Sequence, residues 1–216
     1  MTLLVLGASG GVGRWLTRFA AEDGHDVTAV VRATSAFDAP ASVRVIRGDV
    51  LDPAVLASAI EGQDAVASCL GLRRASKHPW GALRSPPDFT TRVTRSLVPA
   101  MERAGIRRLV SISAGGVAES ITQLSAPVRW LVSAGNVGVA YRDLAEMERL
   151  LSASRLDWLA VRPVTLVDGK PTGRAGPVTR YGLFSIIRRA DVAAWMLGAL
   201  ARKTPFIEQT VLLGTV

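Results

Sequence analysis

Short apolar runs alternate along the chain with longer stretches in which apolar and polar residues are spaced as on an amphipathic helix. The runs are rich in Val, Ile and Leu, which is typical of strands covered on both faces. Runs predicted as strands are residues 3–6, 27–31, 43–46, 65–69, 109–112, 158–161 and 211–213. The alternation predicts an α/β fold with a doubly wound, mainly parallel sheet and helices on both faces.

The stretches between these runs predict helices over residues 12–21, 53–60, 88–104, 141–153 and 191–200. Two of them carry a start signal. Asp52 precedes Pro53, which is typical of an N-cap followed by proline at the first helical position. Asp191 is predicted as the N-cap of the last helix.

Two segments interrupt the alternation, residues 72–87 and 167–182, and both are predicted as loops after the carboxyl ends of strands. Open α/β sheets bind ligands at that edge. The first loop is basic and contains Trp80, so it is interpreted either as a lid over an acidic aromatic acceptor or as a solvated insertion. The apolar run 127–132, with Trp130, either walls the pocket or packs against another subunit.

The composition fits one folded domain over residues 1–216, with 49% hydrophobic and 20% charged residues. No apolar run reaches the roughly 18 residues of a membrane span, and no basic leader precedes the first strand, so we expect a cytoplasmic protein without a membrane segment. The single cysteine, Cys69, is interpreted as a buried small residue. His25 and His78 have no ligand-like neighbours, so no metal site is expected.

The formal net charge of +8 comes mostly from arginines spread along the chain. Because they form no block and no nucleic-acid motif is present, acidic small molecules are favoured over nucleic acid as partners.

A glycine-rich segment, Gly7-Ala8-Ser9-Gly10-Gly11-Val12-Gly13, directly follows the first predicted strand and opens the first helix. In this context such spacing is the dinucleotide-binding fingerprint of a Rossmann-type domain, because the backbone amides and the helix N-terminus receive a pyrophosphate. The predicted cofactor contacts in this segment are Gly7, Ser9, Gly10, Gly11, Val12 and Gly13.

The end of the second predicted strand favours NADP(H) over NAD(H). Arg32 stands there, with Ser35 close behind, and an arginine at this place accommodates a 2′-phosphate. An exposed arginine without a ligand is the structural alternative. Further contacts expected from strand ends are Asp49 and Val50 at the adenine and Cys69, Leu70 and Gly71 beside the cofactor, unless these residues only form turns.

The chain resembles the atypical short-chain dehydrogenase/reductase-like proteins with an NAD(P)H-binding domain. The resemblance rests on the glycine-rich segment and on the segments 31–32, 48–50, 62–66, 111–114, 156–158, 161–163 and 189–193. Its layout is similar to that of the NADPH-dependent biliverdin/flavin reductases and, more distantly, to the nitrogen-metabolite-repression type of dinucleotide sensor.

Typical members of the wider superfamily use a serine, a tyrosine and a lysine four residues after the tyrosine. Here Tyr141 follows Ser113, but position 145 is alanine and no lysine occurs between Lys77 and Lys170. A Tyr-Lys mechanism is therefore not expected. Ser113 and Tyr141 are the candidate catalytic residues, with packing at a helix start as the alternative for Tyr141.

The biliverdin/flavin reductase resemblance implies direct hydride transfer from NADPH to an acceptor stacked on the nicotinamide. It implies that Ser113 and Ser111 lie near the nicotinamide and that Pro163, Val164 and Thr165 approach the carboxamide. The relative has histidine in place of Thr165 and a shorter loop than 72–87. The loops expected to cover the substrate are approximately 72–87, 114–140 and 164–185.

We therefore predict an NADPH-dependent oxidoreductase that transfers hydride to a conjugated small molecule: a flavin, a quinone, a tetrapyrrole-like compound or a specialised metabolite. A flavin is a candidate substrate. The alternative is a non-catalytic NADP(H) sensor that acts through a protein partner. Either would be a monomer or a homodimer, and the sequence leaves the acceptor and the proton donor open.

Overall fold

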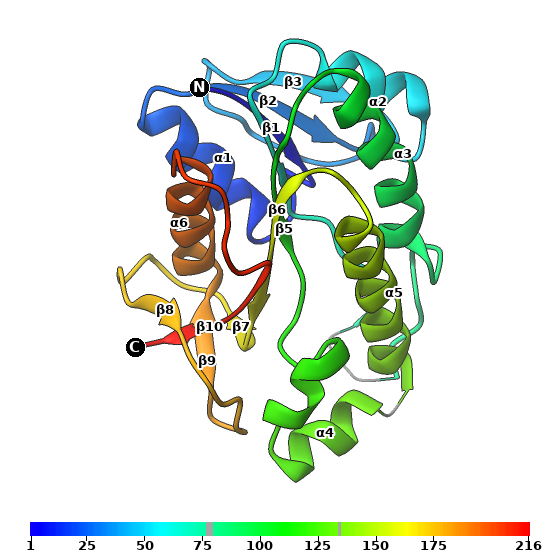
Figure 1. Cartoon of the computed structure of the whole chain (residues 1–216), viewed down its shortest axis with the longest axis vertical. Helices are drawn as coiled ribbons and strands as arrows, with labels where there is room; N and C mark the ends of the chain where they lie inside the picture. Colours follow the sequence, from blue (N-terminus) through cyan, green and yellow to red (C-terminus); the bar gives the residue numbers. More distant parts are fainter. Residues whose placement is uncertain (77–79, 134) are drawn as a thin grey trace.

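The computed structural model describes residues 1–76, 80–133 and 135–216 (Figure 1). Lys77 and His78 of the predicted basic loop lie outside the described residues.

An eight-stranded sheet forms the centre of the molecule. In spatial order its strands are β3 (Arg44–Arg47), β2 (Asp26–Val31), β1 (Thr2–Leu6), β4 (Ala65–Ser68), β5 (Arg108–Ile112), β6 (Asp157–Pro163), β10 (Thr210–Thr215) and β8 (Ala175–Pro177). Neighbouring strands are parallel, except that β8 is antiparallel to β10. The strand order reverses between β1 and β4, which creates the topological switch point at which such sheets bind ligands.

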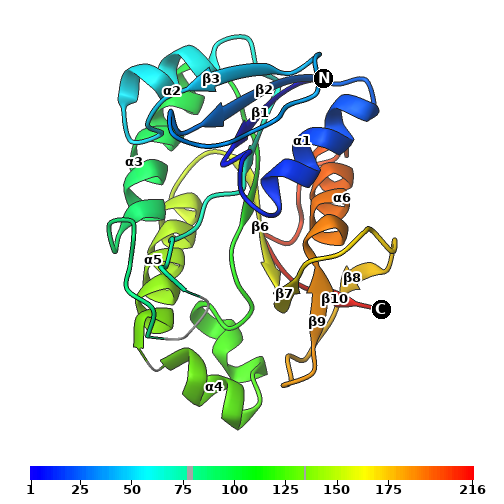
Figure 2. The ribbon, with the colours of Figure 1, turned by 180° about the vertical axis from the view of Figure 1, so that it is seen from behind.

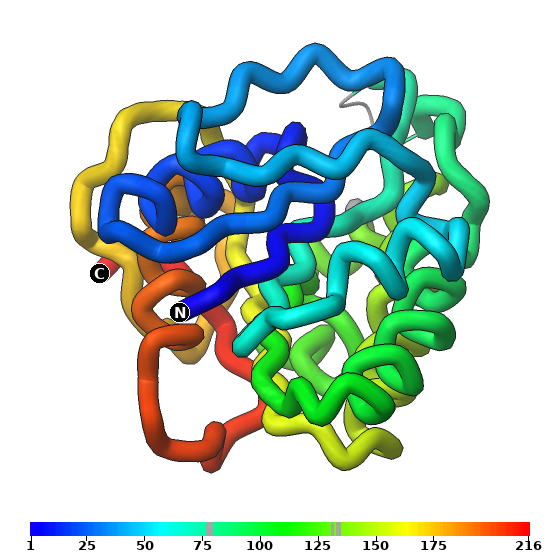
Figure 3. The backbone as a smooth tube through the Cα atoms, turned by 90° about the horizontal axis from the view of Figure 1, so that it is seen from above, coloured from blue at the N-terminus to red at the C-terminus, as the bar shows by residue number. Residues whose placement is uncertain are grey.

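Helices cover both faces of the sheet, so the predicted doubly wound α/β fold is confirmed. Helices α1 (Gly13–Glu22) and α6 (Arg189–Leu200) lie on one face, and α2 (Pro53–Ile60), α3 (Phe89–Arg103) and α5 (Gly135–Ser152) on the other. The view from above shows the two helical layers on either side of the sheet (Figure 3).

Each central strand contributes to two hydrophobic cores. In β1, Leu3 and Val5 belong to the core under α1 and α6, whereas Leu4 and Leu6 belong to the core under α2, α3 and α5. All four are fully buried. Because successive side chains of a strand point to opposite faces, a continuous apolar run is what a strand with two covered faces requires.

The start of α2 is as predicted, but the start of α6 is not. Asp52 caps α2, accepting a hydrogen bond from the Ala54 amide at 2.9 Å. By contrast, α6 begins at Arg189, so Asp191 is not its N-cap. Its carboxylate instead accepts hydrogen bonds from the amides of Thr172, at 2.6 Å, and Gly173, at 2.9 Å, and thereby ties the preceding loop to the helix.

Several elements near the carboxyl edge of the sheet were not predicted. They are η1 (Ala118–Gln123), α4 (Ala126–Ser133), β7 (Thr165–Val167) and β9 (Ile186–Arg188). The predicted loop 167–182 contains β8, and β7 pairs in parallel with β9. Helix α5 begins at Gly135, six residues before the expected start, because packing overrides the weak helix propensity of its glycines and valines.

Across the described residues, we find no helix with the length and apolar character that crossing a membrane requires.

Candidate functional site

The glycine-rich segment makes a tight turn between β1 and α1. Gly7 has a φ of +76°, and its carbonyl oxygen accepts a hydrogen bond from the Gly10 amide at 2.9 Å. A Cβ at Gly13 would lie 2.2 Å from that same oxygen, so only glycine allows the helix to start this close to the strand. Val12 is buried at the N-cap position of α1, and Gly11 packs against the Arg189 side chain of α6.

A cavity of about 450 Å³ opens at the carboxyl ends of β1, β2, β3 and β4. It brings together a large part of the predicted cofactor contacts: Gly7, Ser9, Gly10, Arg32, Asp49, Val50, Cys69, Leu70 and Gly71. Its wall also contains residues between β4 and the start of α3 that the sequence interpretation did not assign to the cofactor: Arg73, Arg84, Ser85, Pro86 and Phe89. The cavity lies at the switch point of the sheet, which is where a dinucleotide binds in this fold.

A cluster of four polar residues, here called the polar group, lies at the predicted 2′-phosphate position beside Arg32: Ser9, Arg14, Ser35 and Arg47. The hydroxyls of Ser9 and Ser35 lie 3.3 Å apart. Arg14 donates a hydrogen bond to the Ser9 carbonyl at 3.3 Å, and Arg47 donates one to the Ser35 carbonyl at 3.0 Å. The sequence interpretation missed both arginines, although the place of Arg14 directly after Gly13 was a usable signal.

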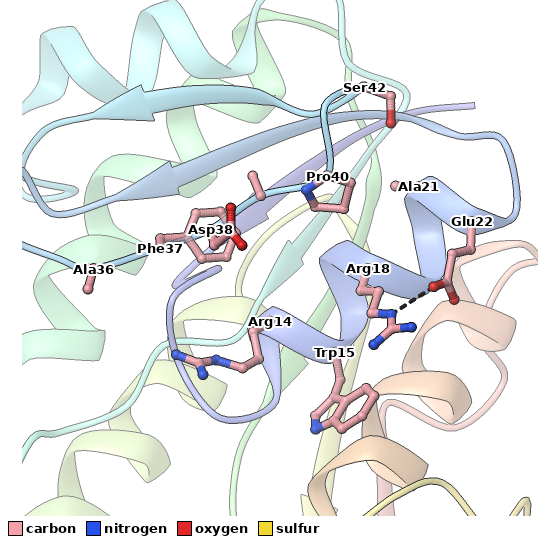
Figure 4. A pocket seen from close by; sticks show the side chains of 11 residues that line it. Arg14, Trp15, Arg18, Ala21, Glu22, Ala36, Phe37, Asp38, Pro40 and Ser42 are labelled. Atoms are coloured by element: carbon pink, nitrogen blue, oxygen red, sulfur yellow. Dashed lines mark hydrogen bonds and ion pairs between the residues drawn. The ribbon is translucent and has the colours of Figure 1, made fainter.

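A wider groove of about 990 Å³ adjoins this polar group, between α1 and residues 36–42 (Figure 4). Arg14 belongs to both. Trp15 and Arg18 form the helical wall, and Phe37 lies on the opposite side. In this groove Arg18 is engaged with Glu22 at 2.7 Å, whereas Arg14 donates its hydrogen bond to Ser9.

The structure defines the protonation state of Cys69 and the orientation of Asp49, two residues of the cavity wall. Burial raises the pKa of the Cys69 thiol to about 12, so this thiol is protonated and unreactive near neutral pH. One carboxylate oxygen of Asp49 accepts a hydrogen bond from the Leu51 amide at 2.9 Å, which orients the side chain at the end of β3.

Ser113, one candidate catalytic residue, belongs to a buried charged network. Its hydroxyl donates a hydrogen bond to Glu148 at 2.6 Å, and Glu148 forms an ion pair with Arg162 at 2.5 Å. The three residues are 6%, 5% and 3% exposed, respectively. Arg162 also pairs with Glu119, which lowers the pKa of that carboxyl. Although burial opposes it, hydrogen bonding to the two carboxylates raises the pKa of Arg162, so the guanidinium stays charged.

Tyr141, the other candidate, lies inside α5 and not at a helix start. Its hydroxyl donates a hydrogen bond to the Gly115 carbonyl at 2.9 Å. Burial, and secondarily Tyr181, raises its pKa, while Arg74 acts in the opposite direction. Tyr141 is therefore a neutral donor at physiological pH.

The predicted carboxamide contacts lie around the start of β7. The amide of Val164 donates to the Leu213 carbonyl at 2.9 Å, and the Pro163 carbonyl accepts from Gly115 at 2.9 Å. The Thr165 hydroxyl lies 2.8 Å from that of Tyr181, a residue that the sequence interpretation missed. Ser111 is buried, with its hydroxyl 3.4 Å from the Met147 sulfur of α5.

Hydrogen bonds join the three segments expected to cover the substrate. Asn136 donates to the Gly81 carbonyl at 3.0 Å, which links the basic loop to α5. Tyr181 and Gln123 are linked by a backbone bond of 3.1 Å. On the outer side, Trp130 of α4 is 68% exposed and Phe184 is 94% exposed.

Throughout the described ranges, no group of three or more His, Cys, Asp or Glu residues is placed to hold a metal ion.

Two curated proteins are similar to this chain in sequence. The 3-diazoavenalumate denitrifying reductase of a Streptomyces species is 35% identical over 182 residues, 81% of this chain and 59% of that protein. Sterol demethylase protein B of Methylococcus capsulatus is 30% identical over 222 aligned residues, 93% of this chain and 66% of that protein. The chain thus spans roughly three fifths to two thirds of the length of these curated relatives.

Among solved structures, ChuY, an anaerobillin reductase from Escherichia coli O157:H7, has a TM-score of 0.77 at 27% identity. The similarity covers 99% of this chain and 96% of that one. A family model described as NAD(P)H-binding matches residues 7–203. The chain therefore belongs to the NAD(P)H-binding family, as the resemblance to atypical short-chain dehydrogenase/reductase-like proteins implied.

Proposed function

We propose that the protein is an NADPH-dependent reductase that transfers hydride to a conjugated small-molecule acceptor. Membership of the NAD(P)H-binding family and the reductase names of two relatives support the reductase class. The cavity at the switch point would hold the adenosine half of the cofactor, with the glycine-rich turn at the pyrophosphate.

The preference for NADPH is proposed from the polar group beside the cavity. Arg32 lies at the end of β2, where a 2′-phosphate would stand, and Ser9 and Ser35 offer hydroxyls next to it. A phosphate monoester carries about −1.5 to −2 charges at neutral pH, and arginine binds it through charge-assisted hydrogen bonds.

A conjugated acceptor is proposed because of the hydrogen bonds that the two candidate hydroxyls, those of Ser113 and Tyr141, already make. The Ser113 hydroxyl donates its hydrogen bond to Glu148, and the Tyr141 hydroxyl donates its hydrogen bond to the Gly115 carbonyl. The described lysine nearest in sequence is Lys170, so Tyr141 has no lysine partner four residues on. Neither hydroxyl is thus poised as a general acid.

Bound NADPH would supply the hydride. A flavin, quinone or tetrapyrrole-like acceptor delocalises the charge that it receives and can take its proton from solvent, whereas an isolated ketone requires an acid at its oxygen. In this proposal Ser113 accepts a hydrogen bond near the nicotinamide, and Thr165 with Tyr181 lines the acceptor side.

A sensor without turnover is the second candidate. The missing Tyr-Lys pair and the exposed Trp130 and Phe184 favour it, because such side chains suit contact with a protein partner. A sensor would use the same cofactor site as a reductase. The two proposals therefore differ only in whether the protein turns over a substrate and whether it binds a protein partner.

The decisive experiment is NADPH oxidation followed by absorbance against FMN, FAD, simple quinones and biliverdin, with NADPH and NADH binding measured in parallel. Turnover with any of these acceptors would support the reductase. Tight NADPH binding without turnover on the panel would favour the sensor or a specialised substrate. Failure to bind either dinucleotide would overturn both.

Two variants then test the proton source. Ser113→Ala and Tyr141→Phe are each expected to change kcat by less than about tenfold, since general acid catalysis by a side chain is worth about 10²–10⁴. A hundredfold loss in either variant would identify that hydroxyl as the donor and reopen carbonyl acceptors.

A further inference from the structure

Residues 73–76 and 80–86 form the two limbs of an arm after β4, which lies beside α5 (Figure 2). Arg74 and Leu83 form an antiparallel bridge, and the Ala75 amide donates to the Ala82 carbonyl at 2.8 Å. At the base of the arm the Arg84 amide donates to the Arg73 carbonyl at 2.7 Å. The backbone of the arm is therefore paired close to the cavity.

This pairing sets Arg73 directly opposite Arg84. Residues opposite each other in an antiparallel pair share a face, and their neighbours along the strand point the other way. In agreement, Arg73 and Arg84 both line the 450 Å³ cavity, whereas Arg74 acts electrostatically on Tyr141 of α5.

Two like charges directly opposite each other destabilise a strand pair. For the side chains of Arg73 and Arg84, the described part of the chain contains no hydrogen bond or ion pair that offsets this repulsion. The cavity wall also contains a third guanidinium, that of Arg32, and one carboxylate, that of Asp49. The lining of the cavity is thus strongly positive, and an anion bound there would relieve the repulsion.

We propose that Arg73 and Arg84 form a phosphate clamp that holds the bound dinucleotide from the side opposite the glycine-rich turn. The clamp rests on the proposed function, because its anion is the phosphorylated adenosine half of NADPH. The base of the arm is then part of the cofactor site, whereas Arg74 is directed toward Tyr141 of α5.

The test is a titration of NADPH against the wild type, Arg73→Ala, Arg84→Ala and the double variant, monitored by nicotinamide fluorescence. Each single variant should raise the Kd for NADPH about tenfold, the value of one charge-assisted hydrogen bond. Without ligand, the variants should melt at the same temperature as the wild type or higher, because one of two repelling charges is gone. A purely structural role for these arginines would lower that melting temperature.

Smaller probes identify the phosphate that is held. A loss of affinity for 2′-AMP would assign the clamp to the 2′-phosphate, and a loss for ADP would assign it to the pyrophosphate. Nicotinamide riboside, which carries no phosphate, should bind equally to all variants.

Arg92→Ala is the matched control, since Arg92 is exposed on α3 and does not line the cavity. It should leave the Kd for NADPH unchanged. Wild-type-like NADPH binding by the double variant would overturn the clamp while the proposed function stands. No NADPH binding by the wild type would instead overturn the proposed function.

Discussion

Arg32 is the residue on which the choice between the two nicotinamide cofactors depends. It lines the cavity at the end of β2. Replacing it with glutamate sets a negative charge against the 2′-phosphate, which NADH lacks. The Arg32→Glu variant should raise the Kd for NADPH about 100-fold, equivalent to about 2.7 kcal/mol, and the Kd for NADH less than about threefold. Titration of both cofactors measures this. Equal losses would contradict the assignment of Arg32 to the 2′-phosphate.

Glu148 holds the Ser113 hydroxyl and neutralises Arg162 in a buried site. The Glu148→Gln variant keeps the shape but leaves Arg162 with only its bond to Glu119. Because the remaining partner, Glu119, is 71% exposed, it compensates the buried guanidinium only in part, and the free energy of unfolding should fall by about 3 kcal/mol in urea titrations. Glu146→Gln is the control, since Glu146 is solvent-facing and pairs with Arg149 on the surface. Equal stability of both variants would show that the buried pair is not required.

Ser113 illustrates what the sequence reveals at the scale of single residues. The resemblance to the dehydrogenase/reductase family proposed it as a site residue, and its position directly after a predicted parallel strand indicates the edge of the sheet at which it lies. Its partner Glu148 is 35 residues away, on a helix whose rotation against the sheet depends on packing. Spacing along the chain carries no information about that contact.

At the scale of elements, the start of α3 is stabilised by a side chain from another helix. Asp143 of α5 is buried, and its carboxylate accepts hydrogen bonds from the amides of Thr90 and Thr91, each at 2.9 Å. These amides belong to the first turn of α3, where no carbonyl of the helix is available to them. The local N-cap residue, Asp88, makes no such bond.

The Asp143→Ala variant should therefore lower the free energy of unfolding by about 2–3 kcal/mol, because it leaves buried amides without partners. Asp88→Ala, at the position that the sequence favours for a cap, should have little effect. Chemical denaturation of both variants checks this. A larger loss for Asp88→Ala would mean that α3 is capped locally.

The elements that the sequence predicted have either an uninterrupted apolar run or a helical period, and those that it missed are short or depend on packing. Strand β1 is recognisable because Leu3 to Leu6 form an uninterrupted apolar run. Strands β7 and β9 have three residues each and are stabilised by pairing with each other. Such short segments carry too few positions to show a period.

At the scale of the whole molecule, the cavity proposed for the cofactor combines predictable and unpredictable parts. The glycine-rich turn and the strand ends follow from the βαβ pattern, so the residues there could be assigned from the sequence. The arm, residues 73–76 and 80–86, could not, because a loop of that length has no preferred direction until it pairs with itself and contacts α5. The sequence thus predicted the part of the cavity that the glycine-rich turn and the strand ends form, but not the part that the arm forms.

The whole chain is expected to unfold as one cooperative unit, since the covering segments are bonded to one another and to α5. A ligand that binds only the folded state adds a stabilisation of RT ln(1 + [L]/Kd), about 2.7 kcal/mol at a hundredfold excess over the Kd. Calorimetry should therefore show a single transition that moves upward as a whole with NADPH. If the covering segments formed a separate unit, a second transition insensitive to NADPH would appear. That outcome would mean that the cofactor site is built by the sheet alone, without the arm.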